Sequence, residues 1–343
     1  MKGILMRVTL NDIAKLAKVS PSTVSRAIAN NPKISSATRE KVSKIMKDLN
    51  YHPNIIARSL ANKSTRIIGV IIPGVAETAF QNPFFPEVLR GVSSLAHKFK
   101  YNILISSVSN ADEEKQTLKQ FAQGGIAEGI ILLASRVGDP SVEELTKLSF
   151  PFVVIGKPEN KHEVNWVDNN NFTIGYELTK HFLEQGHRKI AFLGLSSNYI
   201  VTLDRLNGYK KALEDKGLPV DERLIIESKF IDDNGYDLMK QLFNRGINPT
   251  GVMAGDDLLA FGAMRFINEQ GLKVPEDIAV SGFNNVQLAN YSSPPLTTVE
   301  INPYLLGSKA FELLLAAINS DYKSYNRAIV PAELVIRGST QIK

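Results

Sequence analysis

The 343-residue chain contains no cysteine and no long apolar run. Without cysteine it can form neither a disulfide framework nor a thiolate metal site. Each apolar run is shorter than the roughly 18 residues that a membrane-spanning helix requires. The segment from Met1 to Met6 is too short for a signal peptide, so we expect a cytoplasmic protein. Met6 directly precedes the first recognisable pattern, so residues 1–5 form an extension or reflect a choice of start site.

Signatures of the common enzyme classes are also missing. The sequence has no G-x-x-x-x-G-K-[ST] phosphate loop, no G-x-G-x-x-G fingerprint and no H-E-x-x-H motif. Gly194-Leu-Ser-Ser-Asn lacks the second glycine of a nucleophile elbow. His181 and His187 flank an expected helix end, where cations more often complement the helix dipole than bind a metal. We therefore expect no catalytic residue, no metal and no cofactor.

Positive charge is concentrated at the N-terminus. Residues 1–63 contain 12 Lys and Arg against 3 Asp and Glu, a balance of +9. The whole chain has 40 against 35, so residues 64–343 carry 28 against 32, a balance of −4. Such a basic segment on an otherwise acidic chain is what a phosphate-binding module requires. A membrane-coating tail is the alternative, but the segment has no aromatic belt.

The same basic segment has the pattern of two short helices joined by a tight turn. Thr9 and Asp12 match a capping box, which predicts a helix that begins at Leu10. Ser20 suits the N-cap of a second helix, and Pro21 suits its first position. Two helices in such close succession predict a helix-turn-helix, whose second helix enters the DNA major groove.

The second helix would present small residues and one arginine to DNA: Pro21, Ser22, Ser25 and Arg26. Small side chains allow close approach, hydroxyls can bind phosphates, and an arginine can reach the O6 and N7 atoms of guanine. A third helix is expected from Ser35 to Leu49. A three-helix domain with no nucleic-acid role is the alternative, and the positive charge argues against it.

Beyond a polar link at residues 61–66, β-branched apolar runs alternate with amphipathic helical patterns. The expected strands are Ile67–Ile72, Ile103–Ser106, Gly129–Leu133, Phe152–Ile155, Ile190–Leu193, Gly251–Ala254 and Ile278–Ser281. The expected helices are Phe85–Lys98, Glu113–Gln123, Tyr176–Glu184, Leu206–Lys216, Tyr236–Asn244, Ala260–Gln270 and Leu305–Ile318. This alternation predicts parallel sheets with helices on both faces.

The N-terminal motifs closely resemble the lac-repressor/galactose-repressor (LacI/GalR) family. The matching runs are Val8-Thr-Leu-Asn-Asp-Ile-Ala, Val19-Ser-Pro-Ser-Thr-Val-Ser-Arg, Ile34-Ser-Ser-Ala-Thr-Arg-Glu-Lys-Val, Leu49-Asn-Tyr-His-Pro-Asn and Asn54-Ile-Ile-Ala-Arg-Ser-Leu-Ala. The resemblance implies a small all-α helix-turn-helix head and an α/β core of two doubly wound parallel-sheet lobes, as in periplasmic binding proteins.

The resemblance also implies how the chain divides into domains. The head would cover residues 1–52, and a hinge helix with its linker residues 53–66. The N-terminal lobe would combine residues 67–170 with 296–326, and the C-terminal lobe residues 171–295 with 327–343. The chain would therefore cross between the lobes near 170, 295 and 327. A ligand cleft is expected at the carboxyl ends of the strands.

By the same resemblance, DNA would be contacted by residues of the helix-turn-helix and the hinge helix: Thr9, Ser20, Pro21, Ser22, Ser25, Arg26, Lys33, Asn54, Ala57 and Leu60. Two hinge helices would meet over the central minor groove, where Leu60 would wedge between base pairs and Ala57 would pack nearby. So short a helix is unstable alone in water and should form only on specific DNA. An ordinary linker residue is the alternative for Leu60.

A sugar-binding cleft needs aromatic faces for C–H surfaces and bidentate polar groups for adjacent hydroxyls. The resemblance places these cleft residues at Phe84, Phe85, Lys157, Tyr199, Arg205, Phe230, Asp256, Phe283 and Asn284. Phe84 and Phe85 could instead be core residues, and Arg205 a surface residue. One of Asp256 and Asp257 should also cap a helix. Trp166 is more readily explained by packing than by stacking on a ligand.

Two departures from many relatives bear on the ligand. Relatives often carry an acidic residue at the positions of Asn284 and Gly156, and here both acids are absent. Lys157 follows, in Val154-Ile-Gly-Lys-Pro. This string, with Trp166-Val-Asp-Asn-Asn and Asp256-Asp-Leu-Leu-Ala-Phe-Gly, is similar to maltose and maltodextrin operon repressors.

The sequence thus predicts a homodimeric transcriptional repressor that binds a DNA operator and responds to a small molecule, with a sugar such as maltose as the first candidate. An effector in the cleft would change the orientation of the lobes and release the operator. Two alternatives stay open: a sugar-sensing activator or catabolite-control regulator that depends on a corepressor, and a solute-binding protein for a transporter.

Overall fold

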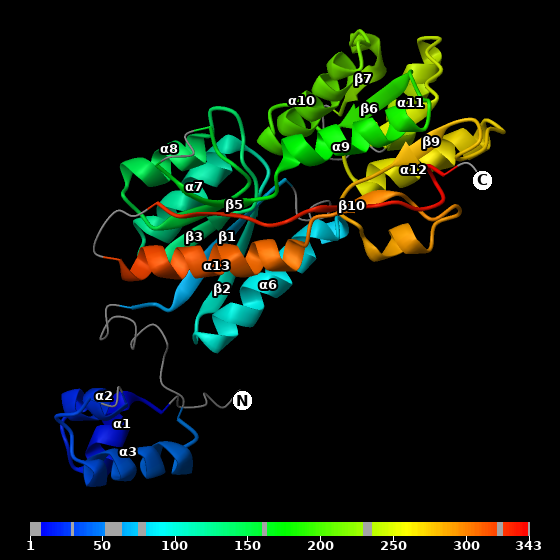
Figure 1. Ribbon diagram of the computed structural model, residues 1–343. Coiled ribbons are helices and arrows are strands. Elements are labelled where there is room, and N and C mark those ends of the chain that lie inside the picture. Colours follow the sequence, from blue (N-terminus) through cyan, green and yellow to red (C-terminus); the bar gives the residue numbers. More distant parts are fainter. Residues whose placement is uncertain are drawn as a thin grey trace, which may run out of the picture.

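The structure is a computed structural model that describes residues 8–28, 31–51, 64–74, 80–159, 163–228, 235–320 and 325–341. Figure 1 shows a small helical head and a larger core of two α/β lobes. The predicted hinge residues Asn54, Ala57 and Leu60 lie outside the described residues, as does the cleft candidate Phe230. No helix in the described ranges is both long and apolar enough to cross a membrane.

The head consists of three helices around a small apolar centre: α1 (Leu10–Ala17), α2 (Pro21–Ile28) and α3 (Ser36–Asp48). Ile13 from α1, Val24 from α2 and Val42 from α3 are almost fully buried against one another. Lys18 ends α1 in a left-handed conformation, φ 55°, which makes the tight turn into α2 possible. The predicted helix-turn-helix is therefore present, followed by the predicted third helix.

The N-terminal lobe is built on a six-stranded parallel sheet. Its strands, in order across the sheet, are β11 (Arg327–Ile329), β5 (Asn165–Asp168), β4 (Phe152–Ile155), β3 (Gly129–Leu132), β1 (Ile67–Pro73) and β2 (Asn102–Val108). One face is covered by α6 (Phe84–Lys98) and α13 (Pro303–Asn319), and the other by α7 (Ala111–Ala122) and α8 (Pro140–Lys147). Trp166 is buried in the second of these layers, as expected of a packing residue.

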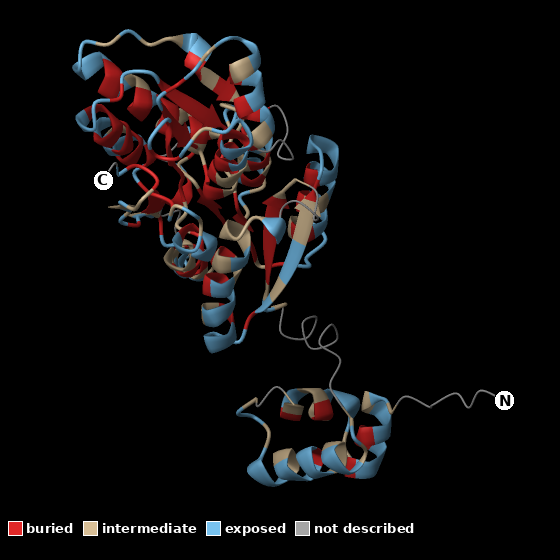
Figure 2. Ribbon diagram, turned by 90° about the vertical axis from the view of Figure 1, so that its right-hand side faces the viewer, coloured by how far each residue is buried: buried red, intermediate tan, exposed pale blue. Residues whose placement is uncertain are grey.

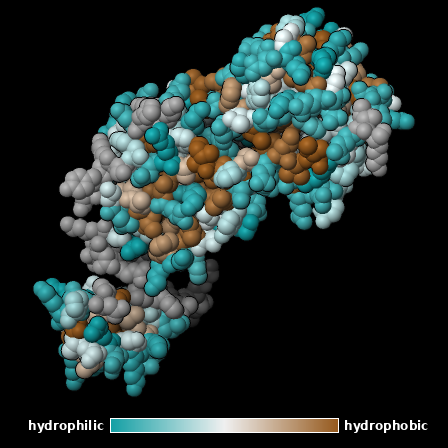
Figure 3. Space-filling model, in the orientation of Figure 1, coloured by the Kyte–Doolittle hydropathy of each residue, from teal (hydrophilic) through white to brown (hydrophobic). Residues whose placement is uncertain are grey.

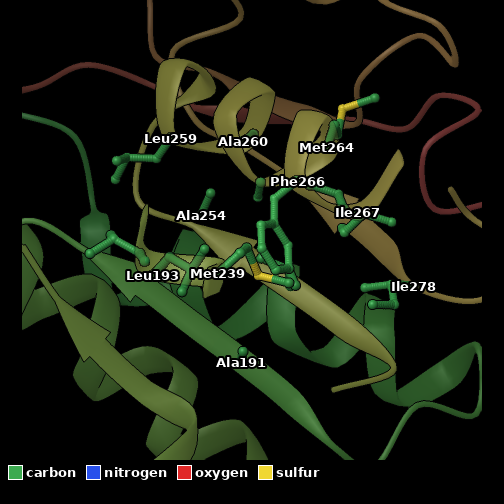
Figure 4. Packing of buried hydrophobic residues seen from close by; sticks show 14 of the residues in the cluster. Ala191, Leu193, Met239, Ala254, Leu259, Ala260, Met264, Phe266, Ile267 and Ile278 are labelled. Carbon is green, nitrogen blue, oxygen red and sulfur yellow. The ribbon is translucent and has the colours of Figure 1, made fainter. Parts of the chain in front are cut away.

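The C-terminal lobe repeats this plan on a four-stranded parallel sheet. Its strands, in order, are β7 (Ile225–Glu227), β6 (Ile190–Gly194), β8 (Gly251–Ala254) and β9 (Ala279–Ser281). The layer on one face contains α9 (Asn171–Glu184) and α10 (Ile200–Asp215), and that on the other α11 (Gly235–Asn244) and α12 (Asp257–Glu269). Figure 4 shows Phe266 of α12 pointing toward Met239 of α11 above the sheet. In Figure 2 the buried residues gather on the sheets and the helix faces that touch them.

Three crossover segments connect the lobes. The first follows β5, the second leads from β10 (Thr298–Glu300) into α13, and the third runs from β11 to β12 (Glu333–Val335). β10 and β12 pair as a short antiparallel ribbon. Figure 3 shows hydrophobic side chains gathered over α13 and where the lobes meet.

Two predicted crossover positions need correction. The second was expected near 295, but Leu296 packs in the C-terminal core and Thr297 still bridges to Ser281 of β9. The third was expected near 327, but Arg327 still pairs with Trp166 of β5 in the N-terminal sheet. The physical reason is that the chain forms one more short strand before each of these crossovers: β10 in the ribbon with β12, and β11 at the edge of the N-terminal sheet. Strands of three residues have no readable periodicity.

The helices α6 and α13 approach closely because glycine stands at their crossing on both sides. A Cβ added at Gly91 would lie 2.1 Å from the carbonyl oxygen of Tyr304, and one added at Gly307 would lie 2.1 Å from that of Val88. Backbone atoms cannot move aside as a flexible side chain can. Gly91 and Gly307 therefore allow the close packing of α6 on α13, the helix that follows the second crossover.

We predict that Gly307→Ala lowers the free energy of unfolding by about 1–3 kcal/mol, the usual cost of overpacking a close contact. Urea unfolding followed by circular dichroism measures this. Ser93→Ala, at an exposed position of α6, is the matched control and should change stability by less than about 0.5 kcal/mol. Equal stability of the two variants would contradict the proposed close packing of α6 on α13.

Candidate functional site

A cavity of about 350 Å³ lies between the lobes, at the carboxyl ends of the parallel strands. This is the end at which open α/β sheets bind ligands. Of the nine residues predicted for the cleft, six line it: Phe84, Phe85, Tyr199, Arg205, Asp256 and Asn284. The cleft expected from the alternation of strands and helices is thus present, with most of its candidate residues in place.

Arg205 is the central polar group of the cleft. It lies on α10 and is 7% exposed, so it is not a surface arginine. Its Nε donates to Oδ1 of Asn171 at 3.0 Å, and one Nη donates to the carbonyl of Gly255 at 2.6 Å. Burial lowers the pKa of Arg205 to about 10, while the charges of nearby carboxylates, Asp168 first, oppose that fall. Since the guanidinium has five N–H donors, some remain for a ligand.

Asp256 lies on the same side of the cavity and has two structural partners. Its Oδ1 accepts from the backbone N–H of Leu259, which caps α12, as predicted for one of the two adjacent acids. Its Oδ2 accepts from Nδ2 of Asn82 at 3.3 Å, across the cleft from the N-terminal lobe. Burial raises the pKa of Asp256, and this hydrogen bonding together with Arg205 opposes the rise. A ligand hydroxyl at Asp256 would compete with Asn82.

The apolar wall of the cavity comes from both lobes. Phe84 and Phe85, at the start of α6, meet edge to face with ring centroids 5.2 Å apart. Both also pack against the N-terminal core, so the predicted core role and the predicted cleft role are compatible for these residues. Tyr199 and Leu195 line the cavity from the C-terminal lobe. Such a wall suits the C–H faces of a sugar.

Two predicted cleft residues do not reach the cavity. Phe283 is fully buried, and its ring lies under the Arg205 guanidinium, whose central carbon is 4.1 Å from the ring centroid. It supports the arginine by a cation–π contact instead of covering a ligand. Lys157 points to the edge of the cleft, where its Nζ pairs with Asp204 at 2.7 Å. Neither is among the residues that line the cavity.

The structure also explains why an acid is missing at Gly156. Its φ of 114° is strained for any residue with a side chain, and an added Cβ would lie 3.0 Å from Cβ of Ser135. A carboxylate at this position would therefore cost conformational energy as well as space. The polar floor of the cleft is supplied instead by the end of β5 and the residues after it.

That floor includes residues that the sequence analysis did not select: Asp168, Asn169 and Asn171. All three are buried: Asp168 ends β5, Asn169 follows it, and Asn171 begins α9. Burial raises the pKa of Asp168 to about 6, although the backbone N–H groups of Lys157 and Asn169 donate to it. The available signal was a run of four polar residues, 168–171, at the end of a buried strand, because ligands bind at strand ends.

The lobes are joined at the rim of the cleft as well as at the crossovers. The backbone N–H of Val137 donates to the carbonyl of Asn198, and that of Ile200 donates to the carbonyl of Ser135. The ion pair between Lys157 and Asp204 also joins the two lobes. These contacts hold the lobes together over the cavity.

Most residues predicted to contact DNA are exposed in the head. Pro21, Ser22 and Arg26 of α2 are exposed, and Ser25 is half-buried. The Oγ atom of Ser20 accepts from the backbone N–H of Thr23 at 3.1 Å, which is the predicted N-cap contact. Arg26 is exposed on α2, whereas the buried residues of α2, Val24 and Ala27, pack in the centre of the head.

Two further residues predicted to contact DNA lie before α1 and after α2. The hydroxyl and the backbone N–H of Thr9 both donate to Oδ2 of Asp12, at 2.7 and 2.9 Å. Thr9 therefore has a structural role at the start of α1, and its hydroxyl oxygen can still accept one hydrogen bond. Lys33 is exposed beyond α2, and its backbone N–H donates to Oδ1 of Asn31.

His181 and His187 have structural partners in the C-terminal lobe. Nε2 of His181 bonds with Oγ1 of Thr340 at 2.9 Å, and Nδ1 of His187 bonds with Oγ1 of Thr250 at 3.2 Å. Burial lowers the pKa of both rings. In the ranges that the structure describes, no group of three or more potential ligands could hold a metal ion.

Comparison with known proteins agrees with both parts of the structure. Residues 9–54 match the family described as bacterial regulatory proteins, lacI family, and residues 179–340 match the periplasmic binding protein-like domain. The HTH-type transcriptional regulator MalR of Streptococcus pneumoniae is 38% identical over 321 residues, which cover 92% of this chain and 94% of the relative.

Two solved structures share the fold along nearly the whole chain. The transcriptional regulator CelR–cellobiose complex has a TM-score of 0.76 and 29% identity, and the match covers 97% of this chain and 100% of that one. The lac repressor dimer bound to operator and the anti-inducer ONPF has a TM-score of 0.81 and 26% identity, over 98% and 99% of the two chains.

The buried Asp257 should make the stability of the protein depend on pH. Its Oδ1 and Oδ2 accept from the Thr298 hydroxyl and the Val286 N–H, and burial raises its pKa to about 7. An acid with a raised folded-state pKa contributes stability that is complete below its unfolded pKa near 4 and is lost as pH rises through about 7. Asp257→Asn removes this dependence.

The stability of the Asp257→Asn variant relative to wild type should therefore rise by more than about 1 kcal/mol between pH 4.5 and pH 8. Urea unfolding of both proteins at four pH values in this range measures the difference. A constant difference between the two proteins at every pH would show that Asp257 does not titrate there.

Proposed function

The chain belongs to the lacI family of bacterial regulatory proteins, and on that premise we propose that it is a homodimeric repressor controlled by a neutral sugar. Its family makes it a DNA-binding transcriptional regulator and not an enzyme. The observation that carries the sugar assignment is the buried Arg205, which lies beside Asp256 in a cavity with an aromatic wall. A DNA partner supports a cytoplasmic location for this repressor.

In this proposal, the exposed residues of α2 contact the bases and phosphates of the operator. Arg26 is the one residue on this face with a bidentate donor edge for guanine, while the serines suit phosphate oxygens. The hinge contacts proposed for Asn54, Ala57 and Leu60 rest on the resemblance of their motif alone, because these residues lie outside the described ranges. In this scheme the hinge helices form on the operator and separate when the effector binds.

The proposed effector is a small saccharide, with maltose as the first choice. Arg205 and Asp256 offer donors and an acceptor to neighbouring hydroxyls, and Asn284 adds an amide at the cavity wall. Asp168 and Asp256 are both acidic, whereas Arg205 is the one cation among the residues that line the cavity, so a sugar phosphate is disfavoured. The volume of about 350 Å³ is near the lower end of ligand cavities, which favours a short sugar over a long maltodextrin.

The proposed homodimer has candidate surfaces on both lobes. Leu104 and Ile105 are exposed on β2, at the edge of the N-terminal sheet, with exposed fractions of 38% and 42%. In the C-terminal lobe, Leu288 is 59% exposed and Tyr291 73% exposed, in and directly after the short 3-10 helix Gln287–Asn290. Large apolar side chains gathered at such places commonly mark protein contacts.

Of the two alternative functions predicted from the sequence, one is rejected and one remains. A solute-binding protein has no use for a helix-turn-helix head that matches a regulatory family, so this alternative is rejected. A catabolite-control regulator that depends on a corepressor remains the second candidate. It differs in one measurable respect: maltose alone would leave its operator affinity unchanged.

The first prediction here concerns base reading. Arg26→Ala should cost about 1–3 kcal/mol on operator DNA and much less on random DNA, because only a contact to base edges discriminates between them. Fluorescence anisotropy with both DNAs at one fixed salt concentration measures the two losses. Lys41→Ala, which removes an exposed cation from α3, is the control and should not lower the ratio of operator to random affinity. Equal losses on both DNAs would make Arg26 a phosphate contact.

The second prediction concerns the effector. Arg205→Ala should bind operator but should no longer respond to sugar, because its loss leaves ligand hydroxyls unpaired at a cost of about 1–3 kcal/mol or more. Calorimetric titration with mono-, di- and trisaccharides, beside operator binding, tests both halves of this statement. Arg205→Met, which preserves packing over Phe283, guards against a folding defect.

Arg223→Ala serves as the control for Arg205, because Arg223 is an exposed arginine of the same lobe, paired with Asp221 at the surface. It should bind sugar as wild type does. Equal sugar affinity in wild type and both Arg205 variants would remove Arg205 from the site. If wild type binds no saccharide, the sugar assignment is wrong.

A further inference from the structure

We propose that Asn169 is the residue that ties the three crossover segments together, and that a buried chain of polar side chains connects it to Arg205. The inference rests on the proposed function only for the identity of the ligand that Arg205 would hold. Asn169 is 5% exposed and follows β5 at the first crossover. In this role it is a positioning residue, which acts on the orientation of the lobes.

The connection begins at the arginine. Asn171, which is 2% exposed, accepts from Nε of Arg205 through its Oδ1 at 3.0 Å. Its Nδ2 donates to Oδ1 of Asp168 at 2.9 Å. The same oxygen of Asp168 accepts from the backbone N–H of Asn169 at 2.8 Å. A continuous path of hydrogen bonds therefore runs from the C-terminal lobe to the first crossover.

Asn169 then reaches the other two crossovers with one group. Its side-chain Nδ2 donates to the carbonyl of Ile301, on the second crossover, and to the carbonyl of Val330, on the third, at 3.0 Å each. An amide group has two N–H donors, so both are used. Among the hydrogen bonds of the described residues, this is the side chain that holds all three segments together.

These contacts make the crossovers move as a unit. A rotation of one lobe against the other must displace the three segments relative to one another or turn them together. Because a buried carbonyl that loses its donor is left unsatisfied, the Asn169 amide favours the second outcome. Because Arg205 lines the cavity and donates to Asn171, a ligand held by Arg205 and the three crossovers belong to one hydrogen-bond network.

The chain offers a matched control one residue away. Asn170 is exposed, and its Oδ1 accepts from the backbone N–H of Thr173, which caps α9. Asn170→Ala therefore removes an asparagine side chain from the same segment without touching the crossover contacts. Asn169→Ala and the similarly sized Asn169→Leu remove both crossover donors.

Distances between the lobes provide the direct test. The chain has no cysteine, so Lys147→Cys on α8 and Lys240→Cys on α11 give one specific spin-label site on each lobe. Pulsed electron paramagnetic resonance on the full-length, sugar-free protein then measures the distribution of interlobe distances. We expect both Asn169 variants to broaden this distribution at least 1.5-fold, and Asn170→Ala to match wild type.

An unchanged distribution in both Asn169 variants overturns the proposal, as does equal broadening in Asn170→Ala. If Asn169→Ala fails to fold and Asn169→Leu folds, the interlobe distances of Asn169→Leu test the proposal. Saturating maltose adds a second readout, because at saturation a change in sugar affinity does not affect the result. Maltose should change the operator affinity of Asn169→Leu at most one tenth as much as it changes that of wild type. If maltose has no effect on wild type, the sugar assignment fails, and the sugar-free distances still decide the role of Asn169.

Discussion

The burial of one positive charge, that of Arg205, constrains the rest of the cleft. A guanidinium removed from water is tolerated only when its donors and its charge are compensated. Here the compensation comes from the face of Phe283, the carbonyl of Gly255, the amide of Asn171 and the carboxylates around them. Because Asn171 begins α9 directly after the first crossover, the arginine that would hold a ligand is also hydrogen-bonded beside the connection between the lobes.

The head and the core differ in charge and in the size of their apolar centres. The head concentrates the basic residues and needs only a small apolar centre, formed by Ile13, Val24, Val42 and their neighbours. The core is acidic in balance and is held by large buried layers on both faces of each sheet. This division lets the DNA affinity depend on phosphate charge while the cleft responds to a neutral ligand.

Much of this could be predicted from sequence because it depends on local rules. Caps at Thr9 and Ser20 locate α1 and α2, and β-branched runs locate the longer strands. The short strands β10, β11 and β12 could not be found in this way, because they exist only through pairing with distant segments. Phe283 and Lys157 were misplaced for a related reason: sequence position gives the loop, whereas packing against Arg205 or Asp204 decides where the side chain points.

In this mechanism, binding of a sugar in the cleft lowers the affinity of the helix-turn-helix head for operator DNA. The most direct measurement is the affinity of the full-length wild-type protein for its operator, titrated by fluorescence anisotropy with and without saturating maltose at constant salt. We expect at least a tenfold loss of operator affinity with sugar and no change on random DNA. Calorimetric binding of maltose that leaves operator affinity unchanged would contradict it.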